Sequence, residues 1–319
     1  MANIISPVNS LQLLVQEEVA SLQLTQYPMV NRLAKKVTSQ QVIKWNANVG
    51  GAGATGELTT ASVSTFSDDD YVSAILPIGG ARTRSSFQLQ KEDIAQAKVA
   101  GKGVLRDLFA ADINSGIRTI LEALSAKVYS GSGVAADGGV IGLVTAAAAA
   151  GIYANIDPAT YTAWASYVNT NGTNRALTAS LLYATEVGIT RKGGNYTAIY
   201  CSPEIAVKYK ELFAAQLSIT NQLAPGQADI SYTGLTFSGR PIIQDIYCPA
   251  NTLYFVDENE VALYSFGQNN SQDRQGLQFS IGELPSDNPD AEKYVIYTKA
   301  QLQLKNRAKG VAVLDKITQ

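Results

Sequence analysis

The chain has 319 residues, 16 of them Tyr, a formal net charge of −2 and only 16% charged residues, whereas typical soluble domains carry roughly 25%. This length suffices for one large or two smaller domains, and the charge balance argues against a protein that holds nucleic acid by neutralising its phosphates. Because interface cores are poor in charge and rich in Tyr, the composition favours extensive self-association.

The absent residue types exclude several chemistries. The sequence has no His, which removes Ser-His-Asp and Cys-His catalysis and the commonest zinc and copper ligand. Its two cysteines, Cys201 and Cys248, are too few for a disulfide framework and have no partner at metal-ligand spacing. A reducing cytosol fits this usage. The N-terminus lacks a basic region before an apolar core, and no run reaches membrane-helix length, so neither secretion nor a membrane location is predicted.

Residues 1–40 are predicted to form an arm that lies against other surfaces. Their apolar residues recur too irregularly for a long helix, and Pro7 and Pro28 interrupt the segment. We expect no independent core here, and we expect the arm to need a partner in order to become ordered.

Residues 41–80 are predicted to form a long β-hairpin. An apolar stretch that includes Trp45 forms its first limb, and residues 71–76 form the return limb, which ends at Pro77. Because an isolated two-stranded hairpin is marginal in water, its natural shelter is a neighbouring subunit.

The tip of this hairpin carries Gly51, Gly53 and Gly56 at the G-x-G-x-x-G spacing of a dinucleotide-binding loop. That chemistry requires a helix directly after the last glycine. Residues 57–66 are instead dominated by Thr, Ser and Val, which favours a strand. The acids Asp68, Asp69 and Asp70 lack the spacing of a calcium loop. We therefore predict a hairpin tip, with no catalytic residue, cofactor or metal.

The next region is helical. Residues 91–93 lead into a short helical stretch that ends at Gly101 and Gly103, and a long helix is predicted from Val104 to Tyr129 because its apolar residues recur at spacings of three and four. At 1.5 Å per residue this helix spans about 40 Å. The Ser/Gly stretch 130–133 is a suitable stop.

Residues 134–290 alternate helices and strands. We predict a helix from about Asn174 that is closed at residues 193–194, and then a strand at 196–200. Ser202 and Pro203 open another helix. Three strand-like pieces follow, at residues 235–237, 241–247 and 251–256.

The C-terminal part suggests strands at residues 293–297, 301–304 and 310–314. Its cations from residue 293 onward are opposed only by Asp315. Either a solvated strand face or an anionic partner explains them. These cations are Lys293, Lys299, Lys305, Arg307, Lys309 and Lys316.

The order of arm, hairpin, long helix, α/β region and returning strands resembles that of the major capsid proteins of tailed bacteriophages, which have the Hong Kong 97-type fold. The stretches that carry the resemblance are residues 75–98, 104–129, 198–212 and 234–263. The last contains a G-x-P turn at 239–241, a P-x-N turn at 249–251 and a closing acid, Asp257. These are packing and turn signals rather than catalytic motifs.

The resemblance implies an α+β fold with four parts. Residues 1–40 are the N-terminal arm, and residues 41–80 are the extended loop. Residues 81–133 and 291–319 form the peripheral domain with its spine helix, and residues 134–290 form the axial domain. Candidate assembly contacts lie in the hairpin and in the segments that follow it: Trp45, Gly50, Gly51, Gly53, Gly56, Asp68, Asp69, Asp70, Arg82, Arg84 and Arg106.

The resemblance also implies a structural role without enzymatic activity. Copies of the chain are expected to assemble into pentamers and hexamers of an icosahedral shell, which encloses double-stranded DNA without sequence-specific binding. Portal, scaffolding and decoration proteins are the further expected partners, and assembly is expected in the host bacterial cytoplasm before the protein becomes part of the virion. Some relatives crosslink Lys to Asn, and Lys44 and Asn269 are candidates. Because Met1 lies shortly before the hairpin, a scaffold is expected to be a separate protein.

Three other functions remain open at this stage. An encapsulin-type nanocompartment shell has the same fold, and neighbouring genes for a cargo enzyme would favour it over a phage capsid. A nucleotide-dependent enzyme that uses the Gly51–Gly53–Gly56 loop would be revealed by a cofactor titration. An adhesin or surface-layer subunit fits the low charge, although the missing export signal argues against it.

Overall fold

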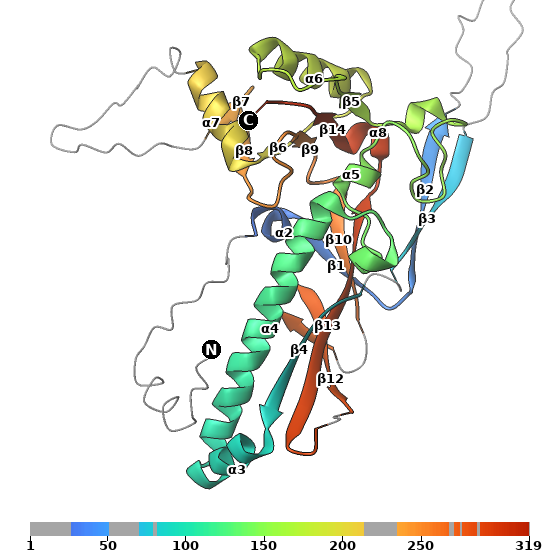
Figure 1. The fold of residues 1–319 in the computed structure, drawn as a ribbon. Coiled ribbons are helices and arrows are strands. Elements are labelled where there is room, and N and C mark those ends of the chain that lie inside the picture. The colour runs from blue at the N-terminus through green and yellow to red at the C-terminus, as the bar shows by residue number, and fades with distance from the viewer. Residues whose placement is uncertain are drawn as a thin grey trace, which may run out of the picture.

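The computed structural model describes residues 27–50, 70–78, 82–213, 235–267, 271–274, 276–285 and 288–318. In these ranges the strands form two six-stranded sheets and one two-stranded ribbon, and a long helix runs along the first sheet (Figure 1). The ribbon consists of β2 (Val42–Gly50) and β3 (Asp70–Pro77). This mixture of sheets and helices confirms the predicted α+β class.

The first sheet is organised around β13 (Ala291–Leu304). Its order is β1-β10-β13-β12-β11, and β4 also pairs with β13. The sequence predicts two strands here, at residues 293–297 and 301–304, but they are one continuous strand. Residues 298–300 contain no turn-forming Gly, Pro, Asn or Asp, and β13 passes there from pairing with β4 to pairing with β10. The other strands are β1 (Ala34–Thr38), β4 (Arg82–Gln90), β10 (Val261–Phe266), β11 (Gln272–Arg274) and β12 (Leu277–Leu284).

The long helix α4 (Lys102–Ser130) confirms the periodic pattern but begins two residues earlier than predicted, and α3 (Lys91–Ala100) precedes it. Gly101, with φ of 123°, separates the two helices. The buried residues Ile117, Leu121 and Leu124 lie on one face. At Gly116 an added Cβ would lie 2.7 Å from Ile296 Cδ1, so this face packs closely on β13.

The second sheet has the order β5-β14-β9-β6-β8-β7. Every residue of β6, β9 and β14 is buried. Helices α6 (Ala179–Arg191) and α7 (Pro203–Phe213) supply Leu182, Ile189, Ile205 and Tyr209 to the same apolar cluster. The strands are β5 (Tyr167–Asn169), β6 (Ala198–Cys201), β7 (Thr236–Phe237), β8 (Arg240–Gln244), β9 (Leu253–Val256) and β14 (Val311–Leu314).

Helix α6 begins five residues after its predicted start at Asn174, with Thr178 as its N-cap. Upstream of it, Arg175 N–H donates to Lys316 O at 2.8 Å, and Thr318 N–H donates to Arg175 O at 2.9 Å. This pairing with the C-terminal segment holds residues around Arg175 in an extended conformation. Helix α7 begins at Pro203 as predicted, and Ile205 N–H donates to Ser202 Oγ at 3.5 Å.

Sheet membership departs from the predicted division of the chain. Strands β10, β11 and β12 fall within residues 134–290 but belong to the first sheet, and β14 falls within residues 291–319 but belongs to the second. The chain therefore passes between the two sheets three times rather than once in each direction. Pairing between strands that lie far apart in the sequence determines the sheet to which each strand belongs, and a local sequence pattern does not predict such pairing.

The end of the predicted arm is part of the body. Helix α2 (Pro28–Arg32) buries Met29 and Val30, and β1 pairs in parallel with β10. Residues 27–38 thus pack on their own chain, because β10 offers β1 a strand edge, whereas the sequence predicted that all of residues 1–40 lie against other surfaces. Residues 1–26 lie outside the described ranges.

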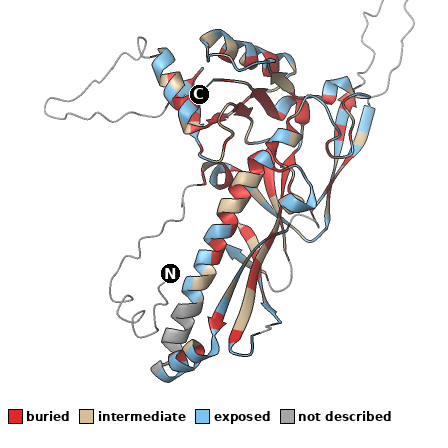
Figure 2. Cartoon of the chain, viewed as in Figure 1, coloured by how far each residue is buried: buried red, intermediate tan, exposed pale blue. Residues whose placement is uncertain are grey.

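The remaining short elements surround the junction of the two sheets, where Figure 2 shows many buried residues. These short elements are η1 (Ala135–Asp137), α5 (Leu143–Ala146), η2 (Thr162–Trp164) and α8 (Arg307–Gly310).

Within the described ranges, no helix is both long enough and apolar enough to span a membrane.

Gly142 lies where the segment after α4 folds back on the end of that helix. An added Cβ would lie 2.5 Å from Lys127 O and 2.6 Å from Gly131 N. We expect Gly142→Ala to lower the free energy of unfolding by about 1–3 kcal/mol, because backbone atoms must move. Urea unfolding of unassembled subunits measures this. Gly172, with no neighbour within 4 Å, is the control, and Gly172→Ala should change stability by less than about 0.5 kcal/mol. Equal effects would contradict the prediction.

Candidate assembly surfaces

The base of the ribbon is confirmed as an antiparallel pair, from Val42 opposite Pro77 to Gly50 opposite Asp70. One face is buried within the same chain: Ile43, Ala47, Val49, Ala74 and Leu76 are each at most 6% exposed. Ile75 N–H also donates to Ala154 O at 2.9 Å. The expectation that the hairpin finds its shelter on a neighbour is thus wrong for its base, because the chain's own turn at residues 153–156 and helix η2 cover it.

Trp45 lies on this inward face. Its indole Nε1 donates to Lys305 O at 2.9 Å, which anchors the half-buried side chain in its own chain; its role as an assembly contact stays a prediction. Lys44, on the opposite face of β2, is exposed. Its candidate crosslinking partner Asn269 lies outside the described residues.

The pairing of β2 with β3 is irregular at the end of the described ribbon. The pairing register shifts between Asn48 and Gly50, and Gly50 N–H donates to Asn48 Oδ1 at 3.2 Å. A Cβ on Gly50 would lie 3.3 Å from Asp70 Oδ2, so a small residue suits this position. Gly51, Gly53, Gly56, Asp68 and Asp69 lie outside the described residues. Within the described part, no cluster of three or more potential metal-ligating side chains is present.

Arg82 and Arg84 are exposed on one face of β4. Residues directly opposite each other in an antiparallel pair point to the same face, and the register places Arg84 opposite Tyr297 and Arg82 opposite Lys299. The Arg82 guanidinium lies 5.4 Å from the centre of the Tyr297 ring. The structure therefore brings two predicted contact residues together with an aromatic ring and a further cation.

The same face continues onto β10 and β1. The Lys299 ammonium lies 5.1 Å from the centre of the Phe266 ring, and the Lys36 ammonium lies 5.6 Å from that of Tyr264. Cations placed over aromatic rings in this way gain about 0.5–1 kcal/mol at exposed sites. We call this surface the basic sheet face and define it as Lys36, Arg82, Arg84, Lys293 and Lys299 with Tyr264, Phe266 and Tyr297.

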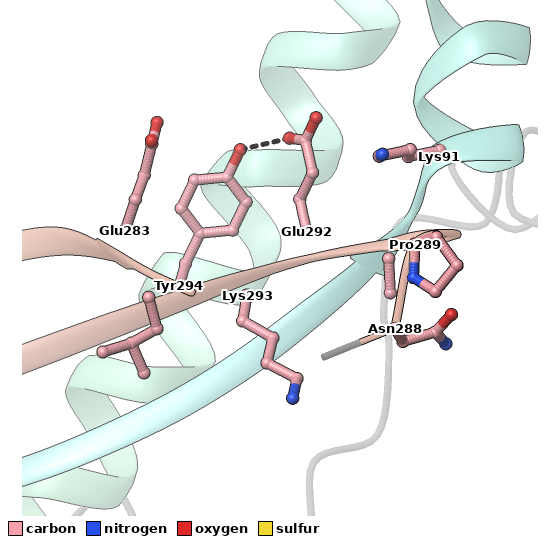
Figure 3. Close-up of a pocket in the computed structure, with 9 residues that line it drawn as sticks. Lys91, Glu283, Asn288, Pro289, Glu292, Lys293 and Tyr294 are labelled. Atoms are coloured by element: carbon pink, nitrogen blue, oxygen red, sulfur yellow. Dashed lines mark hydrogen bonds between the residues drawn. The ribbon is translucent and has the colours of Figure 1, made fainter. Parts of the chain in front are cut away.

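The alternation of the strands keeps acids off the basic sheet face. Among the residues of β1, β4, β10, β13 and positions 280–284 that share it, none is Asp or Glu. Figure 3 shows Glu292 and Tyr294 on the opposite side of β13 from Lys293. The Tyr294 hydroxyl donates to Glu292 Oε2 at 2.6 Å, and this hydrogen bond raises the pKa of Tyr294 to about 12.

The sequence analysis left an anionic partner open for Lys293 and Lys299 and proposed no contact role for the other residues of this face, namely Lys36, Tyr264, Phe266 and Tyr297. The alternation of side chains within β13 was the signal that could have found them, but its partner strands β10 and β4 lie more than 30 and more than 200 residues away in the sequence. Helix α4 covers the other side of the sheet. The backbone of Arg106 belongs to α4, and its side chain lies outside the described part.

A charged clasp ties α2 to the turn before β10. Arg32 donates to Glu258 through Nε at 2.6 Å and Nη2 at 2.9 Å, and the Tyr200 hydroxyl donates to Glu258 Oε1 at 2.6 Å. Burial alone would raise the pKa of Glu258, but the hydrogen bonds from Arg32 and Tyr200 and the adjacent guanidinium outweigh it, so this pKa lies below its usual value of 4.5.

The architecture matches that of solved shell proteins. The cyanophage A-1(L) capsid subunit has a TM-score of 0.79 at 23% identity and covers 95% of this chain and 96% of its own. The SrpI encapsulin of Synechococcus elongatus PCC 7942 has a TM-score of 0.56 at 12% identity, covering 97% and 96%. A satellite phage P4 procapsid that includes the size determination protein has a TM-score of 0.55 at 12% identity, covering 98% and 96%. The fold is thus the Hong Kong 97-like fold of capsid shells.

Among proteins with this shell fold, the amino-acid sequence identifies the family of the chain. Residues 13–318 match the SU10 major capsid protein family, and the chain belongs to that family. It is a structural capsid protein of the phage type and a component of the virion. No curated protein sequence matches the chain.

The hydrogen bonds to Glu258 predict how the free energy of unfolding falls at acid pH. Because the pKa of Glu258 is lowered in the folded state, its stabilising contribution is complete above the unfolded value near 4.5 and is lost as pH falls through the folded value. We expect Glu258→Gln to flatten the fall in unfolding free energy between pH 6 and 3, as measured by urea titrations. Glu211→Gln, which removes an exposed pair with Lys208, should leave the pH profile unchanged. Parallel profiles for wild type and Glu258→Gln would contradict the assignment.

Proposed function

We propose that copies of this chain form the pentamers and hexamers of an icosahedral shell that encloses double-stranded DNA, and that the acidic hairpin of one copy docks on the basic sheet face of its neighbour. The observation that carries the docking is complementary charge. Residues 45–81 contain Glu57, Asp68, Asp69 and Asp70 but no Lys or Arg. The basic sheet face carries cations, and none of the residues that share it on β1, β4, β10, β13 and positions 280–284 is Asp or Glu.

The geometry favours contact between copies over contact within one. In Figure 1 the open end of the ribbon points away from β4 and β13, toward the opposite end of the molecule. A hairpin that continues in this direction moves away from the basic sheet face of its own chain. Each exposed ion pair contributes about 1 kcal/mol or less, but charge complementarity selects which surfaces meet, and closed symmetry repeats the contact in every subunit.

In this proposal the hairpin is the extended loop, and the first sheet with α3 and α4 forms the peripheral domain. The second sheet with α6 and α7 forms the axial domain at the centre of each capsomer. Gly50, Gly51, Gly53 and Gly56 let the hairpin backbone lie flat on the neighbouring surface, and Arg106 is a further contact on α4. This assignment follows sheet membership rather than the boundaries at residues 134 and 290.

Further partners follow from the same role. A shell that fills with DNA needs a portal, and a scaffolding or size-determining protein is needed to set the size of the shell. The satellite phage P4 procapsid includes a size determination protein. We propose that such proteins and decoration proteins bind this shell, that it assembles in the host bacterial cytoplasm, and that it has no enzymatic activity or cofactor.

An encapsulin-type compartment is the second candidate, because the SrpI encapsulin has the same fold. Family membership favours the phage capsid. Terminase, portal and tail genes beside this one would support the capsid, whereas a gene for a cargo enzyme would support the compartment. A titration with nicotinamide and adenine nucleotides tests the nucleotide-binding alternative at Gly51, Gly53 and Gly56.

The role of the hairpin is tested by deleting residues 51–57, which spares the buried Val49 and the described β2–β3 pair. We expect a folded, soluble subunit with unchanged circular dichroism that fails to form closed shells in electron micrographs. Normal shells from this deletion would remove the hairpin from the assembly mechanism.

The docking itself is tested by charge reversal. We expect Arg82→Glu with Arg84→Glu to abolish or strongly reduce shell formation, because like charges then face each other. Replacing Asp68, Asp69 and Asp70 by Lys in the same chain should restore it. Lys98→Glu with Arg191→Glu changes the net charge equally at exposed positions away from this face and is the matched control. Sedimentation and micrographs give the readout, and equal defects in test and control would contradict the docking.

A further inference from the structure

The loop between β5 and α6 contains the one Asn-Gly pair of the sequence, Asn171–Gly172. Figure 1 shows β5 and α6 at the opposite end of the molecule from α3 and β12. All residues of the loop tip, 170–174, are exposed. In an Asn-Gly pair the next backbone nitrogen can attack the side-chain amide carbon with little hindrance, because glycine has no Cβ. The loop therefore offers this reactive pair to water.

The side chain of Asn171 lies beside the peptide that would attack it. Its Nδ2 donates to Thr173 O at 3.2 Å, which folds the amide over the backbone of Gly172. Within the described part of the chain, the Gly172 N–H has no hydrogen-bond partner. A Cβ on Gly172 would meet nothing within 4 Å. Neither packing nor a hydrogen bond from a described residue thus holds this nitrogen away from the amide carbon.

The base of the loop is fixed, in contrast to its tip. Arg175 N–H donates to Lys316 O at 2.8 Å, so the backbone nitrogen that follows Asn174 is occupied. Arg175 Nη2 donates to Asn169 Oδ1 at 2.7 Å, and Asn169 is followed by the β-branched Thr170, whose side chain is stiff and bulky. Among these three described asparagines, Asn171 is the one with both a glycine after it and an unoccupied nitrogen.

We propose that Asn171 deamidates spontaneously in the folded chain. The Gly172 nitrogen loses its proton to solvent and attacks Asn171 Cγ. A C–N bond forms, the Cγ–Nδ2 bond breaks, and ammonia leaves, which gives a cyclic succinimide. Water then opens the ring at one of its two carbonyls and leaves an aspartyl or isoaspartyl residue at position 171. Water is the only co-reactant, and nothing is oxidised or reduced.

The product changes the charge of this part of the surface. Residues 158–185 contain Arg175 and no acid, so the new carboxylate is the first negative charge in the segment. The exposed tip can accept the altered backbone of an isoaspartyl residue, since nothing packs on Gly172. The reaction occurs in a single subunit and does not depend on shell formation. In the proposed shell every copy carries the site, so the shell gains negative charge with age.

The first test follows the conversion in intact, unassembled chains. After incubation, brief chymotrypsin digestion in mildly acid buffer, with cleavage after Tyr167 and Leu177, releases residues 168–177, which contain all three asparagines of the segment. Fragment masses show where –NH₂ has been replaced by –OH. We expect Asn171 to convert at least about tenfold faster than Asn169 or Asn174, and faster at higher pH because the attacking nitrogen must lose a proton. Equal conversion at the three positions would contradict the inference.

A synthetic peptide of residues 168–177 separates the effect of the fold from that of the sequence. We expect the rate at Asn171 in the folded chain to lie within about threefold of the rate in the peptide. Conversion at Asn174 should be at least about tenfold slower in the folded chain than in the peptide, because the fold occupies the Arg175 nitrogen. If the fold protects Asn171 as strongly as Asn174, the inference is overturned.

Gly172→Ala is the matched variant. Because its effect on stability is expected to be small, a change in rate does not reflect unfolding. We expect it to slow conversion at Asn171 by at least about tenfold, since the added Cβ hinders the attack. Thr173→Ala keeps both the Asn-Gly pair and the accepting carbonyl and should convert at the wild-type rate. Equal rates for Gly172→Ala and Thr173→Ala would overturn the inference. Since unassembled subunits are used, this result is independent of the proposed function.

Discussion

One buried guanidinium connects the two sheets to the base of the hairpin. Arg307 is fully buried, at the point where the chain leaves β13 for the second sheet. It donates to Gly151 O at 2.7 Å and to Ala150 O at 3.0 Å. These carbonyls precede the turn whose Ala154 O accepts from Ile75 in β3. The direction of the ribbon therefore depends on a contact more than 200 residues away from β3 in the sequence.

Both Nη atoms of Arg307 donate to backbone carbonyls, whereas its buried Nε has no hydrogen-bond partner within the described part of the chain. Burial lowers the pKa of Arg307, because the low-dielectric interior disfavours the charge, and the carbonyl partners compensate by accepting charge-assisted hydrogen bonds. A buried charge that loses its partners costs several kcal/mol. These hydrogen bonds thus fix the position of residues 145–151. The turn that follows them bonds to β3, so the base of the ribbon is positioned within its own chain, without a neighbouring subunit.

The sequence predicted those elements whose causes are local. The apolar spacing of α4 and the Ser202–Pro203 start of α7 needed only neighbouring residues. The features that were missed depend on distant pairing. Residues near Arg175 are extended because the C-terminal segment bonds to them. Strand β13 is continuous because it passes from pairing with β4 to pairing with β10. Of the basic sheet face, the sequence predicted only Arg82 and Arg84 as contacts and left an anionic partner open for Lys293 and Lys299, because distant strand pairing brings this face together.

The low charge content makes the placement of each charge matter more. Strand alternation puts cations on one face of the first sheet and leaves Glu283 and Glu292 on the other, while residues 45–81 of the hairpin segment carry acids and no Lys or Arg. Such segregation opposes self-docking by like surfaces and favours one pairing between unlike ones. Because the ribbon base is already ordered within its own chain, docking does not bear the full entropic cost of ordering the hairpin. In the proposed docking, modest electrostatic contacts then suffice to select the neighbouring surface.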